Sequence, residues 1–180
     1  MELELEIKFK VTNKQRLLKK MSLFGMRLQH KEHLIDVYYS PVQGKDFLSP
    51  SRPRLRVRKN MTNSTACLEY HQPHGCHGGI EREVNISDGD MMDVILKQLD
   101  YKEEVRIDKL RTQYKYKELT VDLDQVKGIG TFVEIEIMNP RNKKVAVKKI
   151  RQLAEDLGLK DEIDYNTRYF HLVLAKQGKL

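Results

Sequence analysis

Two pairs of acidic residues are spaced so that each pair could hold a divalent cation. Glu4 and Glu6 stand two residues apart, and so do Glu134 and Glu136. On a β-strand, residues i and i+2 point to the same face. Carboxylate oxygens are the ligands that Mg²⁺ and Mn²⁺ prefer, usually with some water kept in the shell. If both segments are strands, these four carboxylates can contribute to a metal site.

Basic residues repeat this spacing on two other segments. In "RPRLRVRK" every second residue from 52 to 58 is arginine, and in "VRIDKLRTQYK" Lys109, Arg111, Gln113 and Lys115 share a face. Guanidinium and ammonium groups bind anions that carry several charged oxygens, phosphates above all. A complex of polyphosphate with a divalent metal would satisfy the acidic and the basic faces together.

These residues need strands to align them. In the opening stretch "MELELEIKFKV", Leu5 and Ile7 alternate with Glu4, Glu6 and Lys8, which is the period of a β-strand. The same alternation and the turn signals between segments predict eight strands, near residues 2–11, 33–40, 53–59, 64–71, 79–86, 104–115, 118–126 and 131–138.

A single strand of this kind most often turns its polar face to water. Here the polar faces of several strands carry charges of one sign only, so we expect the charged faces to point into a closed or strongly curved sheet. Helices are predicted near 13–24, 89–100, 140–157 and 163–174, and they would cover the apolar faces from outside. Thr12 with Gln15 predicts the cap of the first helix, and Asn139 before Pro140 that of the third. The predicted class is α+β.

Length and composition limit the remaining choices. The chain has 180 residues, two cysteines and a net charge of +7, which favours polyanionic partners in general. We expect one domain over residues 1–180 and a cytoplasmic protein without disulfides, since neither a signal peptide nor an apolar run of ~20 residues is evident. No membrane partner is expected. No nucleic acid partner is expected either, because the basic residues sit on strands that also carry acids and no row of stacking aromatic residues accompanies them. The oligomeric state, a homodimer included, stays open.

The order of the charged motifs resembles that of the CYTH domain family, the triphosphate tunnel metalloenzymes. The segments that carry the resemblance are "ELEIK" at 4–8, "DVYY" at 36–39, "LRVR" at 55–58, "EREV" at 81–84, "KLR" at 109–111, "VDLDQVKGIGTFVEIEI" at 121–137 and Tyr169 with "HLV". They extend over nearly the whole chain. The resemblance implies an eight-stranded antiparallel β-barrel, the triphosphate tunnel, with helices packed outside.

The resemblance also implies roles for individual positions. The residues implied to hold Mg²⁺ or Mn²⁺ are Glu4, Glu6, Glu134 and Glu136, with Asp124 contributing. The residues implied to carry catalysis and bind phosphate are Lys8, Arg58, Lys109 and Arg111, with Arg56 and His71 as further phosphate contacts. The supporting acids, which orient bases or take a second metal ion, are Glu81, Glu83 and Asp122. For each position, a purely structural ion pair is the alternative.

His71 departs from the family pattern. Members usually carry a lysine in an "LTYK"-like segment where this chain has "LEYH". Imidazole is shorter than a lysine side chain and mostly neutral near pH 7, so a phosphate contact is expected to be weaker. Cys67, His71, His74, Cys76 and His77 could instead bind zinc, but their spacing matches no structural finger, and a polar hairpin loop with incidental ligands is favoured.

Three activities remain open at this point. By resemblance, the chain is an enzyme of the class IV adenylyl cyclase type, which converts ATP to cyclic AMP and pyrophosphate. The first alternative is a triphosphatase acting on inorganic triphosphate, thiamine triphosphate or a nucleoside triphosphate. The second is a module that binds polyphosphate or nucleotide without turnover. In that case, His71 at the usual lysine position would be the sign of the lost activity.

Overall fold

The computed structural model describes residues 2–43, 47–49, 52–74, 78–163 and 167–180. The strands are β1 (Glu2–Lys10), β2 (Arg27–Pro41), β3 (Arg54–Asn60), β4 (Thr65–Pro73), β5 (Gly78–Ile86), β6 (Tyr101–Tyr116), β7 (Leu119–Val126), β8 (Gly130–Met138) and β9 (Asp161–Glu162). The helices are α1 (Lys14–Leu23), α2 (Gly89–Gln98), α3 (Lys143–Leu157) and α4 (Tyr169–Lys176). No helix within these ranges is both long and apolar enough to cross a bilayer.

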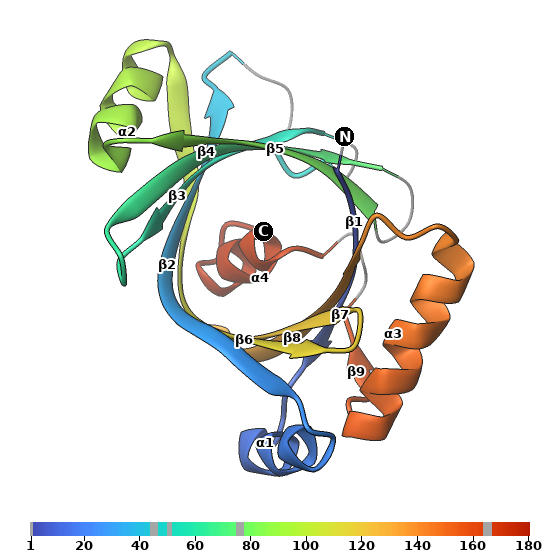
Figure 1. Cartoon of the computed structure of the whole chain (residues 1–180). Coiled ribbons are helices and arrows are strands. Elements are labelled where there is room, and N and C mark those ends of the chain that lie inside the picture. The colour runs from blue at the N-terminus through green and yellow to red at the C-terminus, as the bar shows by residue number, and fades with distance from the viewer. Residues whose placement is uncertain (1, 44–46, 50–51, 75–77, 164–166) are drawn as a thin grey trace.

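Eight antiparallel strands close into a barrel. Their order is β5-β4-β3-β2-β6-β7-β8-β1, and β1 pairs with β5 to complete the ring (Figure 1). The two-residue β9 pairs with the end of β1 at Phe9 and Lys10. The predicted eight-stranded antiparallel barrel is confirmed.

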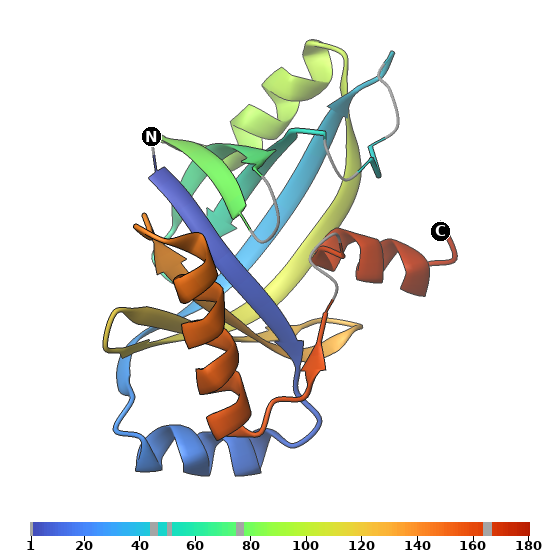
Figure 2. The same cartoon turned by 90° about the vertical axis from the view of Figure 1, so that its right-hand side faces the viewer.

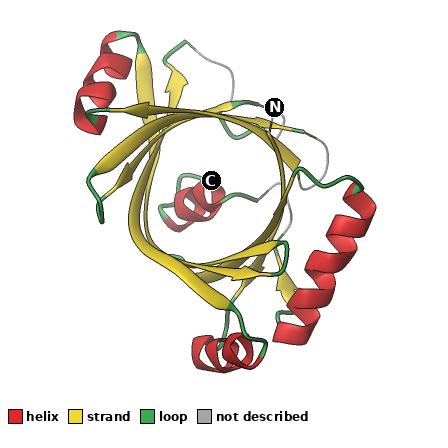
Figure 3. Ribbon diagram, in the orientation of Figure 1, coloured by secondary structure: helices red, strands yellow, loops and turns green. Residues whose placement is uncertain are grey.

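Helices lie outside the ring of strands (Figure 3), and apolar side chains of the strands pack against them. Leu17 of α1 and Ile150 of α3 are buried in one cluster with Ile7 of the barrel wall. On another side, Leu96 of α2 is buried with Val57 of β3. Burying apolar area is the main favourable term in folding, so this arrangement leaves the charged faces to line the interior.

The helix α4 lies across one end of the barrel. It is seen through the ring in Figure 1 and beside one mouth in Figure 2. Tyr169 and Phe170 hold it there: the Tyr169 ring lies 5.2 Å from that of Phe132, and the Phe170 ring 5.0 Å from that of Phe47 (centroid distances). The first turn of α4 therefore reaches the barrel interior.

The predicted helix starts were wrong in detail. Asn13, not Thr12, caps α1, and its Oδ1 accepts from the backbone N–H of Arg16. Asn142 caps α3, whereas Asn139 takes a left-handed φ of 48° and its Oδ1 accepts from the N–H of Leu3. In both places two cap-forming residues stand close together in the sequence, and at Asn139 the bond to Leu3 takes up the side chain that would otherwise cap the helix.

Two element boundaries also differ from the prediction. β2 begins at Arg27 rather than near 33, because residues 27–32 pair with β6 although their sequence does not alternate. The last helix begins at Tyr169 rather than near 163, and part of the earlier stretch (164–166) lies outside the described residues.

Candidate functional site

The barrel interior holds a cavity of about 950 Å³, part of it open to solvent. Ten of the predicted site residues line it: Glu4, Glu6, Lys8, Arg56, Arg58, His71, Glu81, Lys109, Arg111 and Glu134. They come from β1, β3, β4, β5, β6 and β8. Residues far apart in the chain thus share one space because alternate positions of every strand face inward.

Antiparallel register places arginines directly opposite carboxylates on one wall. Asp36 on β2 faces Arg58 on β3, and its Oδ1 accepts from Arg58 Nε at 2.7 Å. Arg56 Nη1 lies 3.3 Å and Lys109 Nζ 3.8 Å from Asp36 Oδ2. Glu69 on β4 completes this group with ion pairs to Arg56 and Arg58. Although burial favours the neutral acid, these cations hold the pKa of Asp36 below its usual range.

A second group of ion pairs centres on Arg111. Its Nε and Nη2 donate to Asp124 at 2.7 and 2.6 Å, its Nη1 lies 2.6 Å from Asp122 Oδ2, and it also contacts Glu134. Lys109 Nζ reaches Asp124 at 3.2 Å. Asp124 is fully buried behind these cations and does not line the cavity, so its first role is to hold Lys109 and Arg111.

The carboxyls of this group differ in how easily they ionise. Glu134 is buried, but the charges of Lys8 and Arg111 hold its pKa well below its usual range. Asp122 shares Arg111 with Asp124, and burial together with the Asp124 charge raises its pKa to about 6. Glu134 is therefore a permanent carboxylate, whereas Asp122 is close to titration at neutral pH.

The opposite wall is rich in acids. Glu6 on β1 pairs in register with Glu136 on β8, and Glu4 is two residues away on the same face. Burial, with the charges of Glu6 and Glu136, raises the pKa of Glu4 well above its usual range. Lys8 Nζ lies 3.2 Å from Glu6 and also contacts Glu134.

The ligand atoms that this acidic wall offers are suited to a divalent cation. All of them are carboxylate oxygens, the ligand type that suits Mg²⁺ or Mn²⁺. The raised pKa of Glu4 reflects burial first and then repulsion among carboxylates, and a bound cation would offset both. Glu4, Glu6 and Glu136 are the residues best placed to hold it, with Glu134 available if Lys8 and Arg111 release it. Glu136 does not itself line the cavity.

His71 occupies the position predicted for a weakened phosphate contact. It lines the cavity, and its ring lies so close to Gly79 that a Cβ at that position would clash with Nε2. Burial and the charges of Arg168 and Arg56 lower the pKa of His71 to about 4. The imidazole is therefore neutral at pH 7 and adds no positive charge to the cavity.

Some lining residues were not among the predicted site residues. Arg54 lies on the same face of β3 as Arg56, so strand alternation could have found it. Arg168 and Phe170 enter from the first turn of α4, and Arg168 Nη1 lies 3.2 Å from Glu6. No periodic signal marks these two residues, because their position depends on how α4 docks.

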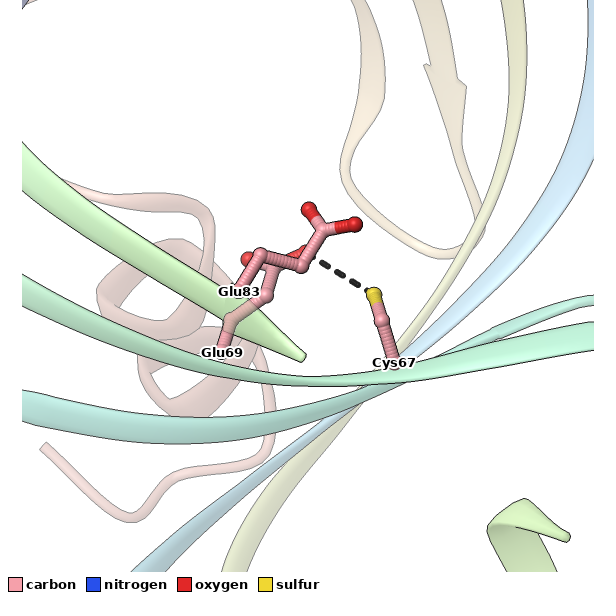
Figure 4. A group of neighbouring side chains, drawn as sticks. All are labelled: Cys67, Glu69 and Glu83. Atoms are coloured by element: carbon pink, nitrogen blue, oxygen red, sulfur yellow. Dashed lines mark hydrogen bonds between the residues drawn. The ribbon is translucent and has the colours of Figure 1, made fainter. Parts of the chain in front are cut away.

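Cys67, Glu69 and Glu83 form another group, shown in Figure 4. Their ligand atoms lie within 4.8 Å of one another. Glu69 is held by Arg56 and Arg58, and burial beside its carboxylate raises the pKa of the Cys67 thiol to about 12. A protonated thiol and an engaged carboxylate fit a metal poorly.

The residues of the Cys/His zinc alternative lie partly outside the described ranges. Cys67 points into the barrel near its far end, and His74 is exposed. Cys76 and His77, which the alternative also requires, lie outside the described residues.

Fold and cavity together define a β-barrel with a charged interior, in which opposed acidic and basic walls can hold an anion together with a cation. The family model of the CYTH domain matches residues 2–169, and the chain belongs to this family.

The chain resembles several archaeal proteins. It is 27% identical over 165 residues to a Methanocaldococcus jannaschii protein named as a candidate adenylate cyclase, with 89% of this chain and 93% of that protein covered. A solved structure from Pyrococcus horikoshii is 28% identical, with a TM-score of 0.82 and coverage of 94% and 98% of the two chains.

A more distant structure shares the fold. It is a candidate adenylyl cyclase from Hippeastrum, described as having a dominant triphosphatase activity. It is 16% identical to this chain, with a TM-score of 0.70 and coverage of 100% and 97% of the two chains. At this identity the likeness concerns the barrel alone.

Proposed function

We propose that the protein is a divalent-metal-dependent enzyme that binds a triphosphate inside the barrel and acts as a class IV-type adenylyl cyclase on ATP. The observation that carries the proposal is the pairing of a basic wall with an acidic wall in one cavity. A triphosphate with its metal supplies the counter-charges that both walls need. The name of the Methanocaldococcus jannaschii relative agrees with this activity.

In this proposal the chain's own residues grip and orient the phosphates. Arg56, Arg58, Lys109 and Arg111 bind phosphate oxygens, and Lys8 reaches them from the acidic side. Each cation is positioned in advance by a carboxylate on a neighbouring strand, as Arg58 is by Asp36. Preorganised cations stabilise the charge that builds on the leaving pyrophosphate without reorganising during the reaction.

Glu4, Glu6, Glu134 and Glu136 would hold Mg²⁺ or Mn²⁺. Such an ion polarises phosphate oxygens and lowers the pKa of a bound hydroxyl group. In the cyclase reaction the ribose 3′-oxygen attacks the α-phosphorus, the bond to the β-phosphate oxygen breaks, and the hydroxyl proton passes to solvent or to a neighbouring base.

The alternative is triphosphatase activity at the same site, with water attacking the terminal phosphorus. Because the Hippeastrum barrel is described as having a dominant triphosphatase activity, the fold alone does not separate the two reactions. A module that binds without turnover remains the third option, since a neutral His71 reduces the positive charge of the basic wall.

Product identification tests the proposal. The protein is incubated with ATP, and separately with tripolyphosphate, in the presence of Mg²⁺ or Mn²⁺. Cyclic AMP with equimolar pyrophosphate is the expected result. Release of orthophosphate without cyclic AMP would replace the cyclase by the triphosphatase, and tight binding without any product would favour the binding module.

The other predictions extend this proposal. We propose that residues 1–180 form a single CYTH domain that acts in the cytoplasm on small triphosphates rather than on nucleic acid or membranes. Whether the domain works as a monomer or a homodimer can be determined by light scattering of the purified protein.

A further inference from the structure

A second cavity opens at the end of the barrel opposite α4. The strand β3 runs from the α4 end of the barrel to this cavity. Its Arg54 stacks on Phe170 of α4 at 5.1 Å, whereas Arg58 and Asn60, further along the strand, line the second cavity. Arg58 and Arg111 line both cavities. The two cavities therefore meet at this pair of guanidinium groups, and a phosphate bound there faces the second cavity, which we call the vestibule.

Two side-chain amides face each other across the vestibule. Asn85 is on β5 and Gln113 is on β6, and four strand steps separate these strands in either direction around the eight-stranded ring. Within the described ranges neither amide has a hydrogen-bond partner. Asn60 differs, because its Nδ2 donates to Glu32 and its Oδ1 accepts from the Thr62 N–H. Asn85 and Gln113 are thus free to bind a ligand.

The charge of the vestibule differs from that of the main cavity. Glu83 lines it and is exposed, and it has no ion pair among the residues that the structure describes. The Glu83 carboxylate disfavours a ligand that places a further negative charge in the vestibule, past Arg58 and Arg111. Inorganic triphosphate is charged at both ends, whereas a nucleoside triphosphate carries an uncharged, hydrogen-bonding group at one end.

Resting on the proposed function, we propose that the vestibule binds the nucleoside of a nucleoside triphosphate. Asn85 and Gln113 hydrogen-bond to the base edge or the ribose, and Glu83 selects against inorganic triphosphate. Amides suit this task because each offers both a donor and an acceptor, as nucleobase edges do. None of the described lining residues is aromatic, so recognition relies on hydrogen bonds rather than on stacking.

Binding measurements test the proposal without depending on turnover. Calorimetry with Mg²⁺ gives Kd for α,β-methylene-ATP and for imidotriphosphate, with wild type, N85A, Q113A and E83Q. The control is Q72A, because Gln72 is exposed and lines neither cavity. We expect N85A and Q113A each to raise the Kd of α,β-methylene-ATP by up to about tenfold. Each should raise the Kd of imidotriphosphate by less than about twofold. E83Q should strengthen the binding of imidotriphosphate more than the binding of the ATP analogue.

The outcomes separate this inference from the proposed function. If N85A and Q113A lose affinity equally for both ligands, or lose none for the ATP analogue, the vestibule does not bind the nucleoside. The proposed triphosphate site would stay in place. Failure of wild type to bind either ligand would overturn the proposed function and the inference with it. A loss in Q72A as large as in Q113A would also contradict the inference.

Discussion

Glu136 is a carboxylate that costs stability and, in our proposal, serves function. It stands beside Glu6 in register, and its charge contributes to the raised pKa of Glu4. Like charges held close together destabilise the folded state unless a cation is bound between them. Residues of this kind mark a site that folding alone would not select.

Glu136→Gln should therefore separate stability from activity. The free energy of unfolding in metal-free buffer is expected to stay the same or rise by up to about 1 kcal/mol as repulsion of Glu4 is relieved. Turnover should fall by at least about a hundredfold if the carboxylate holds the metal. Denaturation curves and product assays measure the two effects. Glu118→Gln, at an exposed residue paired with Lys149, is the control; wild-type turnover in Glu136→Gln would dismiss the metal role.

His71 predicts a pH dependence of stability. It faces Arg54 and Arg56 from β3, Glu6 from β1 and Arg168 from the start of α4, and its pKa is lowered to about 4. The unfolded chain takes up this proton near pH 6.5, the folded chain only near pH 4, so stability is lost as pH falls through this window. Between pH 7 and 5 the loss from this group is up to about 2 kcal/mol.

The measurement is the free energy of unfolding of wild type and His71→Gln at pH 7 and pH 5. The variant should lose less stability than wild type over this interval. An equal loss in both proteins would show that the imidazole titrates normally and carries a charge in the cavity near neutral pH.

At the scale of elements, strand alternation predicted most of the fold. All eight barrel strands were expected from period-two patterns, and Arg56, Arg58, Lys109 and Arg111 indeed face inward because each strand alternates strictly. The partners of these bases could not be predicted from one strand. That Asp36 meets Arg58 depends on the register between β2 and β3, which local sequence does not define.

Helix docking was the other unpredictable part. The sequence placed an apolar helix near the C-terminus, but not its position across the barrel end. Tyr169 of α4 donates its hydroxyl hydrogen to Asp124 Oδ2 at 3.2 Å, and Lys8 Nζ lies 4.3 Å from the centre of its ring. These contacts link the last helix to the ion pairs of the interior.

Tyr169→Phe should weaken this link without breaking the site. Asp124 keeps Lys109 and Arg111 as partners, so the expected loss is about 0.5–1.5 kcal/mol, the net value of one hydrogen bond. Urea denaturation measures it, and Tyr70→Phe, on the outward face of β4, is the matched control. A loss no larger than in Tyr70→Phe would mean that α4 is held by its apolar contacts alone.

At the scale of the whole molecule, the interior is a set of ion pairs that share partners. Glu134 can accept a metal only as Lys8 and Arg111 release it, and these cations can bind phosphate only as they leave Glu134. In our proposal, a metal that uses Glu134, or a phosphate that uses Lys8 and Arg111, would alone have to break these buried ion pairs, which is costly. In the same proposal, the two ligands together would let the ion pairs exchange partners, with the carboxylates holding the metal and the cations binding the phosphates.

This exchange predicts reciprocal coupling between metal and triphosphate. Each should strengthen the binding of the other by at least about tenfold, within the range usual for coupled sites. Arg111→Gln should reduce the coupling, since it removes one of the cations that changes partner. Lys127→Gln, at an exposed lysine on the outside of the barrel, should leave it unchanged.

The most direct test of the account is the Kd of tripolyphosphate measured by calorimetry with and without Mn²⁺. The account predicts binding inside the barrel that is at least about tenfold tighter with the metal than without it. Equal affinity in both conditions, or no binding in either, would contradict the proposal that the two charged walls form one metal–triphosphate site.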